Sequence, residues 1–119
     1  MLLFKKKFLD LIRQGEKTQT IRIWPHRKMR AGQRSYIPGV GYIQVEAVDA
    51  VALDDLTDED ATRDGFASLN DLRDEIERLY PEGLAGGDQL FRIRFRVLSP
   101  AEQAVAVAER KARKALVVE

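Results

Sequence analysis

The sequence predicts an α+β domain, and three patterns in the chain support this fold class. Apolar residues recur at helical spacing near the start, apolar and charged residues alternate in a later segment, and a capped, alanine-rich segment closes the chain. The chain has 119 residues, the length of one domain, and 45% of them are hydrophobic and 33% charged. No apolar run approaches the roughly 18 residues that a membrane span needs. We therefore expect a soluble globular protein that does not enter a membrane.

The first predicted elements are a helix and a strand. Apolar residues at helical spacing predict a helix over Lys6–Gln14, and Gly15 ends it as a C-cap. The next segment is rich in β-branched residues, which predicts a strand over Lys17–Trp24. Pro25 stops this strand because proline lacks the backbone N–H that a sheet requires.

Two further strands are predicted after a basic loop at residues 26–32. Arg34–Ile37 is expected to form a short strand, and the glycines and proline of residues 38–41 predict a turn. Tyr42–Val51 alternates between apolar and polar residues, which predicts a long strand with one solvent-exposed face. Only Asp49 breaks this pattern. The side chains expected on its buried face are Ile43, Val45, Ala47 and Val51.

A helix and a strand are predicted in the second half of the chain. Ser68 and Asp71 form a variant capping box that opens a helix, and Pro81 with Gly83 closes it. Leu90–Leu98 has the clearest strand pattern in the sequence, because its apolar residues alternate with arginines. These arginines are Arg92, Arg94 and Arg96.

A C-terminal helix is predicted over about Pro100–Leu116. Ser99 supplies its cap, Pro100 occupies the first helical position and Glu102 completes the capping box. Its expected apolar face consists of small residues, so we expect it to pack weakly. These residues are Ala104, Val105, Ala108 and Ala112.

Charges are strongly segregated along the chain, although the net charge is only +1. Residues 1–34 contain ten Lys or Arg and two acids, whereas residues 49–77 contain eleven acids and two Arg. A basic stretch can concentrate an anionic ligand such as a nucleotide or an RNA backbone. Two solvated charged faces would produce the same counts, and this alternative stays open.

The composition also excludes several kinds of chemistry. The chain has no cysteine, which excludes disulfides and thiolate catalysis and fits a reducing cytoplasm. Its first residues carry charges where a signal peptide needs an apolar stretch, so we expect a cytoplasmic protein. The single histidine, His26, has no partner ligands nearby in the sequence. We therefore expect no metal site and no cofactor.

The segment Gly15–Arg22, with the sequence GEKTQTIR, holds the residues best suited to chemistry. Strand alternation places Thr20, Arg22 and Trp24 on one face. Arginine offers a planar fork for phosphate or carboxylate, tryptophan offers a stacking face for a base, and threonine offers a hydroxyl. Together these groups suit a nucleotide. Lys17 has the opposite parity and joins them only if the chain bends after Gly15. The alternative is an exposed strand face with salt bridges.

This segment resembles the signature of the ASCH domain family, with the preceding helix and the turn at Arg30-Ala31-Gly32-Gln33 in matching order. A second match runs from Leu56-Thr57 through residues 61–66 to Leu79-Tyr80-Pro81. The resemblance implies a PUA-like mixed β-barrel flanked by short helices. It further implies an ASCH domain over residues 1–98 and a helical extension over residues 99–119.

Small bacterial members of that family include amidohydrolases that remove the acetyl group of N4-acetylcytidine with a Lys, a Thr and a Glu. By resemblance these positions fall on Lys17, Thr20 and Asp64. The resemblance suggests Thr20 as the nucleophile or the group that positions water, Lys17 as general base and Asp64 as the group that orients it. Arg22 would bind the ribose-phosphate side or steady the acid. Asp is one methylene shorter than Glu, so we expect the acid to fall short of the substrate or of Lys17.

Two other functions stay open on the sequence. A non-catalytic RNA-binding module would use Lys17, Arg22, Trp24, Arg27 and Lys28 to contact phosphates and stack bases. The third hypothesis is that the protein is an RNA-cleaving member of the same family. The expected partner is therefore RNA or a modified nucleoside, and the sequence leaves the oligomeric state open.

Overall fold

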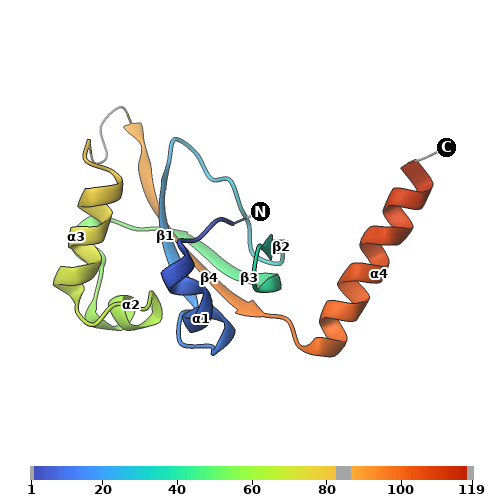
Figure 1. Cartoon of the computed structure of the whole chain (residues 1–119). Coiled ribbons are helices and arrows are strands. Elements are labelled where there is room, and N and C mark those ends of the chain that lie inside the picture. The colour runs from blue at the N-terminus through green and yellow to red at the C-terminus, as the bar shows by residue number, and fades with distance from the viewer. Residues whose placement is uncertain (1, 83–86, 118–119) are drawn as a thin grey trace.

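The computed structural model describes residues 2–82 and 87–117 (Figure 1). It is an α+β fold, as the sequence predicts. The expected helix-closing position Gly83 lies outside the described residues. The elements in chain order are α1 (Lys6–Arg13), β1 (Gln19–Trp24), β2 (Arg34–Ile37), β3 (Gly41–Ala50), the 3-10 helix η1 (Leu53–Asp55), α2 (Asp58–Arg63), α3 (Leu69–Leu79), β4 (Gln89–Val97) and α4 (Pro100–Val117).

One curled, antiparallel sheet organises the molecule, with the strand order β1-β4-β3-β2. The strand with the clearest sequence pattern, β4, lies inside this sheet and pairs with both β1 and β3. The strand β1 lies at one edge, and its outer side therefore faces helices rather than another strand. Among the described helices, none is long and apolar enough to cross a lipid bilayer.

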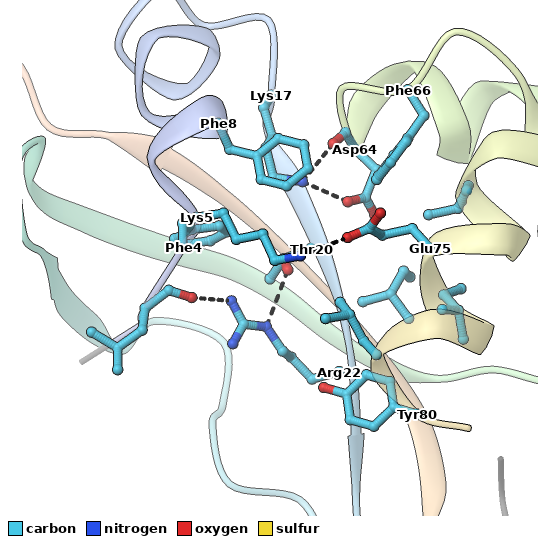
Figure 2. A pocket seen from close by; sticks show the side chains of 15 residues that line it. Phe4, Lys5, Phe8, Lys17, Thr20, Arg22, Asp64, Phe66, Glu75 and Tyr80 are labelled. Carbon is cyan, nitrogen blue, oxygen red and sulfur yellow. Dashed lines mark hydrogen bonds and ion pairs between the residues drawn. The ribbon is translucent and has the colours of Figure 1, made fainter. Parts of the chain in front are cut away.

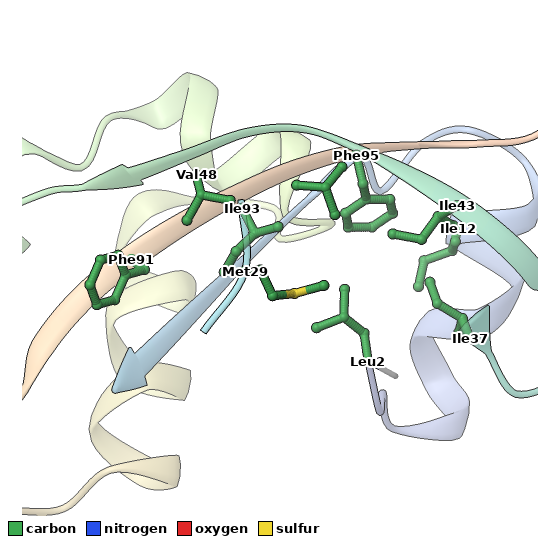
Figure 3. Packing of buried hydrophobic residues seen from close by; sticks show 10 residues of the cluster. Leu2, Ile12, Met29, Ile37, Ile43, Val48, Phe91, Ile93 and Phe95 are labelled. Carbon is green, nitrogen blue, oxygen red and sulfur yellow. The ribbon is translucent and has the colours of Figure 1, made fainter. Parts of the chain in front are cut away.

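The two faces of the sheet carry separate hydrophobic cores. On one face Phe95, Ile93 and Ile43 pack against Ile12 of α1 and the N-terminal residue Leu2 (Figure 3). On the other face Ile21, Ile23 and Leu90 pack against α2 and α3. The helices of the two cores thus approach the edge strand β1 from opposite sides, which creates space for a site along its outer edge.

A β-bulge corrects the predicted face of β3. Val45 pairs with Phe95 while Ala47 pairs with Arg94, so Glu46 is an extra residue in the strand. The extra residue reverses the alternation, and Val48 is buried where Ala47 was expected. For the same reason Val51 packs in the other core, next to α2 and α3.

The residues through which α4 packs against the sheet differ from those expected. Its cap is as predicted, because Ser99 and Glu102 exchange hydrogen bonds of 2.9 and 3.2 Å. The predicted apolar face, Ala104, Val105, Ala108 and Ala112, is exposed. Instead Gln103 bonds the backbone of Tyr42 at 2.8 and 2.9 Å, which turns Ala106 toward the sheet and buries it. One turn later Glu109 pairs with Arg34 of β2 at 2.6 Å, and beyond this contact α4 leads away from the sheet (Figure 1).

Gly65 is required where the chain leaves α2. Its φ is +88°, and a Cβ there would lie 3.2 Å from Leu11 Cδ1 and 3.6 Å from Lys17 Cβ. Gly32 has the same φ of +88° but has no atom within 4 Å of such a Cβ. A substitution at Gly32 therefore tests the effect of the positive φ alone, whereas one at Gly65 tests the positive φ together with steric crowding.

We expect Gly32→Ala to lower the free energy of unfolding by about 1–2 kcal/mol through backbone strain alone. Gly65→Ala should lower it further, because the new methyl would also lie only 3.2 Å from Leu11 Cδ1, which must move to make room. Urea denaturation of both variants measures the difference. Equal losses in the two variants would show that the close approach at Gly65 is unimportant.

Candidate functional site

A cavity of about 280 Å³ lies along the outer edge of β1 (Figure 2). Its walls come from the N-terminal segment and α1, from β1, from the end of α2 and from α3. The polar side chains in it are contributed by both halves of the charge-segregated sequence. These are Lys5, Lys17, Thr20 and Arg22 from the basic stretch and Asp64 and Glu75 from the acidic one.

Lys17 enters the cavity from a tight turn and not from the strand. Gly15 has a φ of +77°, and the backbone N–H groups of Glu16 and Lys17 both donate to Leu11 O, at 2.9 and 3.1 Å. The strand β1 begins only at Gln19, so strand alternation does not apply to Lys17. The bend after Gly15, which Lys17 needs in order to join Thr20 and Arg22, is therefore present.

Lys17 and Asp64 form a buried ion pair. The Lys17 Nζ lies 2.5 Å from Asp64 Oδ1 and 2.5 Å from Asp64 O, and each residue is only 3% exposed. Asp64 therefore reaches Lys17 despite its shorter side chain, and of the two expected shortfalls only the one toward the substrate stays a prediction. The backbone explains the reach, since Thr18 N donates to Arg63 O at 2.8 Å and holds the end of α2 against the turn.

Three aromatic rings surround the ammonium group of this pair. The Nζ of Lys17 lies 4.5 Å from the centroid of Phe8 and 5.8 Å from those of Phe4 and Phe66. The rings exclude water while their faces attract the cation. The result is a charged pair in an apolar pocket.

Burial pushes both partners of the pair toward their neutral forms. It lowers the pKa of Lys17 and raises the pKa of Asp64, while the attraction between the two charges opposes each shift. Asp64 Oδ2 has no hydrogen-bond partner in the described part of the chain, so one carboxyl oxygen is not engaged. Opposite shifts of a lysine and a carboxyl in one cavity make this pair a candidate for proton transfer.

Thr20 and Arg22 are joined on the same face of β1, as predicted. Arg22 Nε donates to Thr20 Oγ1 at 3.2 Å, and Arg22 Nη2 donates to Leu3 O at 2.8 Å. The Thr20 oxygen thus accepts from a cation, and its hydroxyl hydrogen is not needed for that bond. Thr20 is only 5% exposed, which keeps this hydroxyl away from bulk water.

The other predicted binding residues lie outside the cavity. Trp24 packs on Phe91 in the core, with 5.5 Å between ring centroids. Arg27 donates to Val48 O and stacks over the same Phe91 ring. Lys28 lines a separate open hollow with Arg27 and its neighbours. In the described ranges no three His, Asp or Glu side chains are grouped to hold a metal ion.

The sequence analysis missed two charged residues of the cavity, Glu75 and Lys5. Glu75 accepts from Lys5 Nζ at 3.3 Å and is also paired with Arg78 of its own helix. One signal in the sequence pointed to it: Glu75 lies three residues after Leu72 and one before Ile76, on the buried stripe of α3. The other acids of that helix lie off this stripe.

A buried polar network fixes α2 behind the cavity. Asp60 caps the helix by accepting from Thr57 N at 3.0 Å. The Gln19 amide donates to Asp60 Oδ1 at 3.2 Å, and Arg92 reaches the same oxygen at 3.3 Å. Because Asp60 and Asp64 are one helical turn apart, this network also sets where Asp64 lies.

Comparison with known proteins identifies the fold. No family model matches the chain, and no curated protein does. A hypothetical protein designated PH0355 superposes with a TM-score of 0.68 at 16% identity, over 81% of this chain and 95% of that one. A DUF984 protein of Enterococcus faecalis superposes with a TM-score of 0.59 at 19% identity, over 77% of this chain and 70% of that one. An ASCH domain from Lactobacillus crispatus superposes with a TM-score of 0.59 at 18% identity, over 75% of this chain and 69% of that one. The chain has the fold of an ASCH domain, as the GEKTQTIR resemblance implied.

We expect the buried pair to be unnecessary for stability. Lys17→Met and Asp64→Leu should each lower the free energy of unfolding by about 3–5 kcal/mol, because each leaves one unpaired buried charge. The double variant should regain most of that loss, since it buries no charge. Urea denaturation of the four proteins tests this, and a double variant as unstable as the sum of the single losses would contradict it.

Proposed function

We propose that the cavity binds a nucleoside and hydrolyses the amide of an N4-acylated cytidine. The observation that carries the proposal is the buried Lys17–Asp64 pair in the same small cavity as the Thr20 hydroxyl. Burying two charges stabilises a fold only weakly, so a pair enclosed by aromatic rings is more easily explained by chemistry than by folding.

The dimensions of the cavity favour a single nucleoside over a length of RNA. Its volume of about 280 Å³ lies near the lower end of the roughly 300–1,000 Å³ range of small-molecule sites. Aromatic and aliphatic side chains form much of its wall, which suits a planar base. The polar groups are few and converge, which suits recognition of one amide.

In the proposed reaction, neutral Lys17 removes the proton of the Thr20 hydroxyl as its oxygen attacks the acyl carbonyl carbon. The C–N bond then breaks, the proton passes from Lys17 to the departing amine, and the acyl group stays on Thr20. Water hydrolyses this ester and regenerates the hydroxyl. Asp64 holds the Lys17 amine in position by its 2.5 Å contact.

The role that we propose for Arg22 differs from phosphate binding. Two of its nitrogens are already engaged, with Thr20 Oγ1 and Leu3 O. A cation that donates to the Thr20 oxygen stabilises negative charge there as the proton leaves. We therefore place Arg22 beside the nucleophile. Trp24, Arg27 and Lys28 have no part in this cavity.

We also propose that residues 1–98 form the working domain and that residues 99–119 are an extension. The cavity takes no residue from α4, which contacts the sheet near Tyr42 at its own first turns. The site is therefore independent of this helix.

RNA binding without catalysis is the second candidate, and a separate feature favours it. Arg27, Lys28, Met29, Arg30 and Gln33 line an open hollow away from the cavity. Lys28 and Arg30 are exposed cations there, suited to phosphate contacts. Such binding would weaken steeply as salt concentration rises.

We expect the protein to release acetate from N4-acetylcytidine, as followed by mass spectrometry. Thr20→Val keeps the shape of the side chain and removes its hydroxyl, so activity should fall by at least about 100-fold. The matched control is Thr18→Val, two residues earlier and outside the cavity, which should retain activity. Lys17→Ala should be inactive as well.

Hydrolysis that persists in Lys17→Ala or Thr20→Val would refute the mechanism. Absence of product with any N4-acylcytidine, together with salt-sensitive retention of a short RNA, would favour the RNA-binding module.

The rate should depend on pH through Lys17. The base must be neutral, so kcat/KM should rise as pH rises through the Lys17 pKa, which burial lowers. The Asp64 carboxylate raises that pKa, so Asp64→Asn should move the rise to lower pH while reducing the maximum rate. A rise that stays in place or moves to higher pH in Asp64→Asn would contradict the assignment of Lys17 as the base.

A further inference from the structure

Glu75 is a second carboxylate in the cavity, and the proposed reaction does not use it. It projects from α3 opposite the N-terminal segment (Figure 2), and its side chain is only 14% exposed. Three cations surround it: Lys5 at 3.3 Å, Lys7 at 3.9 Å and Arg78. Their charges, with the Arg78 hydrogen bond as the largest contribution, lower the pKa of Glu75 and keep it ionised.

These contacts are divided unequally between the two carboxylate oxygens. Lys5 and Arg78 both donate to Oε1. Within the described ranges no side chain donates a hydrogen bond to Oε2, and Lys7 Nζ lies 3.9 Å from it, beyond hydrogen-bond distance. Glu75 is therefore held in a fixed orientation by one oxygen while the other retains its capacity to accept. A carboxylate held in this way is preorganised to bind a hydrogen-bond donor of a ligand.

The chemistry of the proposed substrate limits which donor this is. In an N4-acylated cytidine the base has a single N–H, because its N1 carries the ribose, and this N–H belongs to the amide that Lys17, Thr20 and Asp64 are proposed to engage. Its ring nitrogen and ring carbonyl are acceptors, which an ionised carboxylate repels. The other donors of the nucleoside are the hydroxyl groups of the sugar. Carboxylates bind ribose hydroxyls in other nucleotide sites by the same complementarity.

We propose that Glu75 determines specificity for a ribonucleoside, with its Oε2 accepting hydrogen bonds from the vicinal 2′ and 3′ hydroxyls. This inference rests on the proposed amide hydrolysis. Lys5 lines the cavity on the same side and steadies the carboxylate. The site would thus recognise the acyl group at the end where Lys17 lies and the sugar at the side formed by α3.

The test compares three substrates: N4-acetylcytidine, N4-acetyl-2′-deoxycytidine and the free base N4-acetylcytosine. The wild-type protein should prefer the ribonucleoside over the deoxy analogue by roughly tenfold in kcat/KM, and the free base should be poorer still. In Glu75→Gln the preference should fall toward one, chiefly through a raised KM for the ribonucleoside. Glu75→Ala should abolish the preference completely.

The matched control is Lys7→Met, which removes a cation near the same carboxylate without changing the cavity wall. It should leave the ribose preference intact. Because each preference is a ratio measured within one variant, partial unfolding of a variant cancels from it.

The outcomes separate this inference from the function on which it rests. Equal hydrolysis of the three substrates by the wild type, or a preference that survives in Glu75→Ala, would overturn the role of Glu75 and leave the hydrolysis standing. Absence of hydrolysis with all three would overturn the proposed function and this inference with it.

Discussion

The ion pair between Lys17 and Asp64 is the contact on which the arrangement of the site depends. It joins the turn after α1 to the end of α2, two segments 47 residues apart in the chain. Both backbones are shaped for it: Gly15 turns the chain toward the cavity with a φ of +77°, and Gly65 turns the chain after Asp64 with a φ of +88°. An unpaired charge at this depth would be strongly unfavourable, so the two segments are held together as a unit.

The charge segregation of the sequence acquires a structural meaning through this pair. The basic N-terminal stretch and the acidic central stretch lie on opposite sides of the cavity and meet in two places. Lys17 meets Asp64 at the buried end, and Lys5 meets Glu75 nearer the solvent. Side-chain exposure rises from 2% at Lys17 to 42% at Lys5. Burial therefore acts on the inner pair, lowering the pKa of Lys17 and raising that of Asp64, whereas the outer pair lies nearer the solvent and its Glu75 is kept ionised by the surrounding cations.

Local patterns predicted most of the fold, and long-range geometry explains what they missed. The strand β4 and the caps at Ser68 and Ser99 depend on neighbouring residues alone, so the sequence contains their full signal. The bulge at Glu46 depends on pairing with β4 and leaves no local mark. In the site, strand alternation was enough to predict that Thr20 and Arg22 share one face of β1. The reach of Asp64 and the place of Glu75 depend on how α2 and α3 pack, and the packing of Trp24 on Phe91 depends on the pairing of β1 with β4.

The central claim is that Lys17 is held ready to transfer a proton, and its protonation can be measured directly. Lysine labelled with carbon-13 at Cε reports the charge of each amine by NMR as pH is raised. The account predicts that the Lys17 resonance titrates below the ordinary pKa of a lysine side chain, because burial lowers its pKa. A Lys17 resonance that titrates at or above that ordinary value would contradict the account.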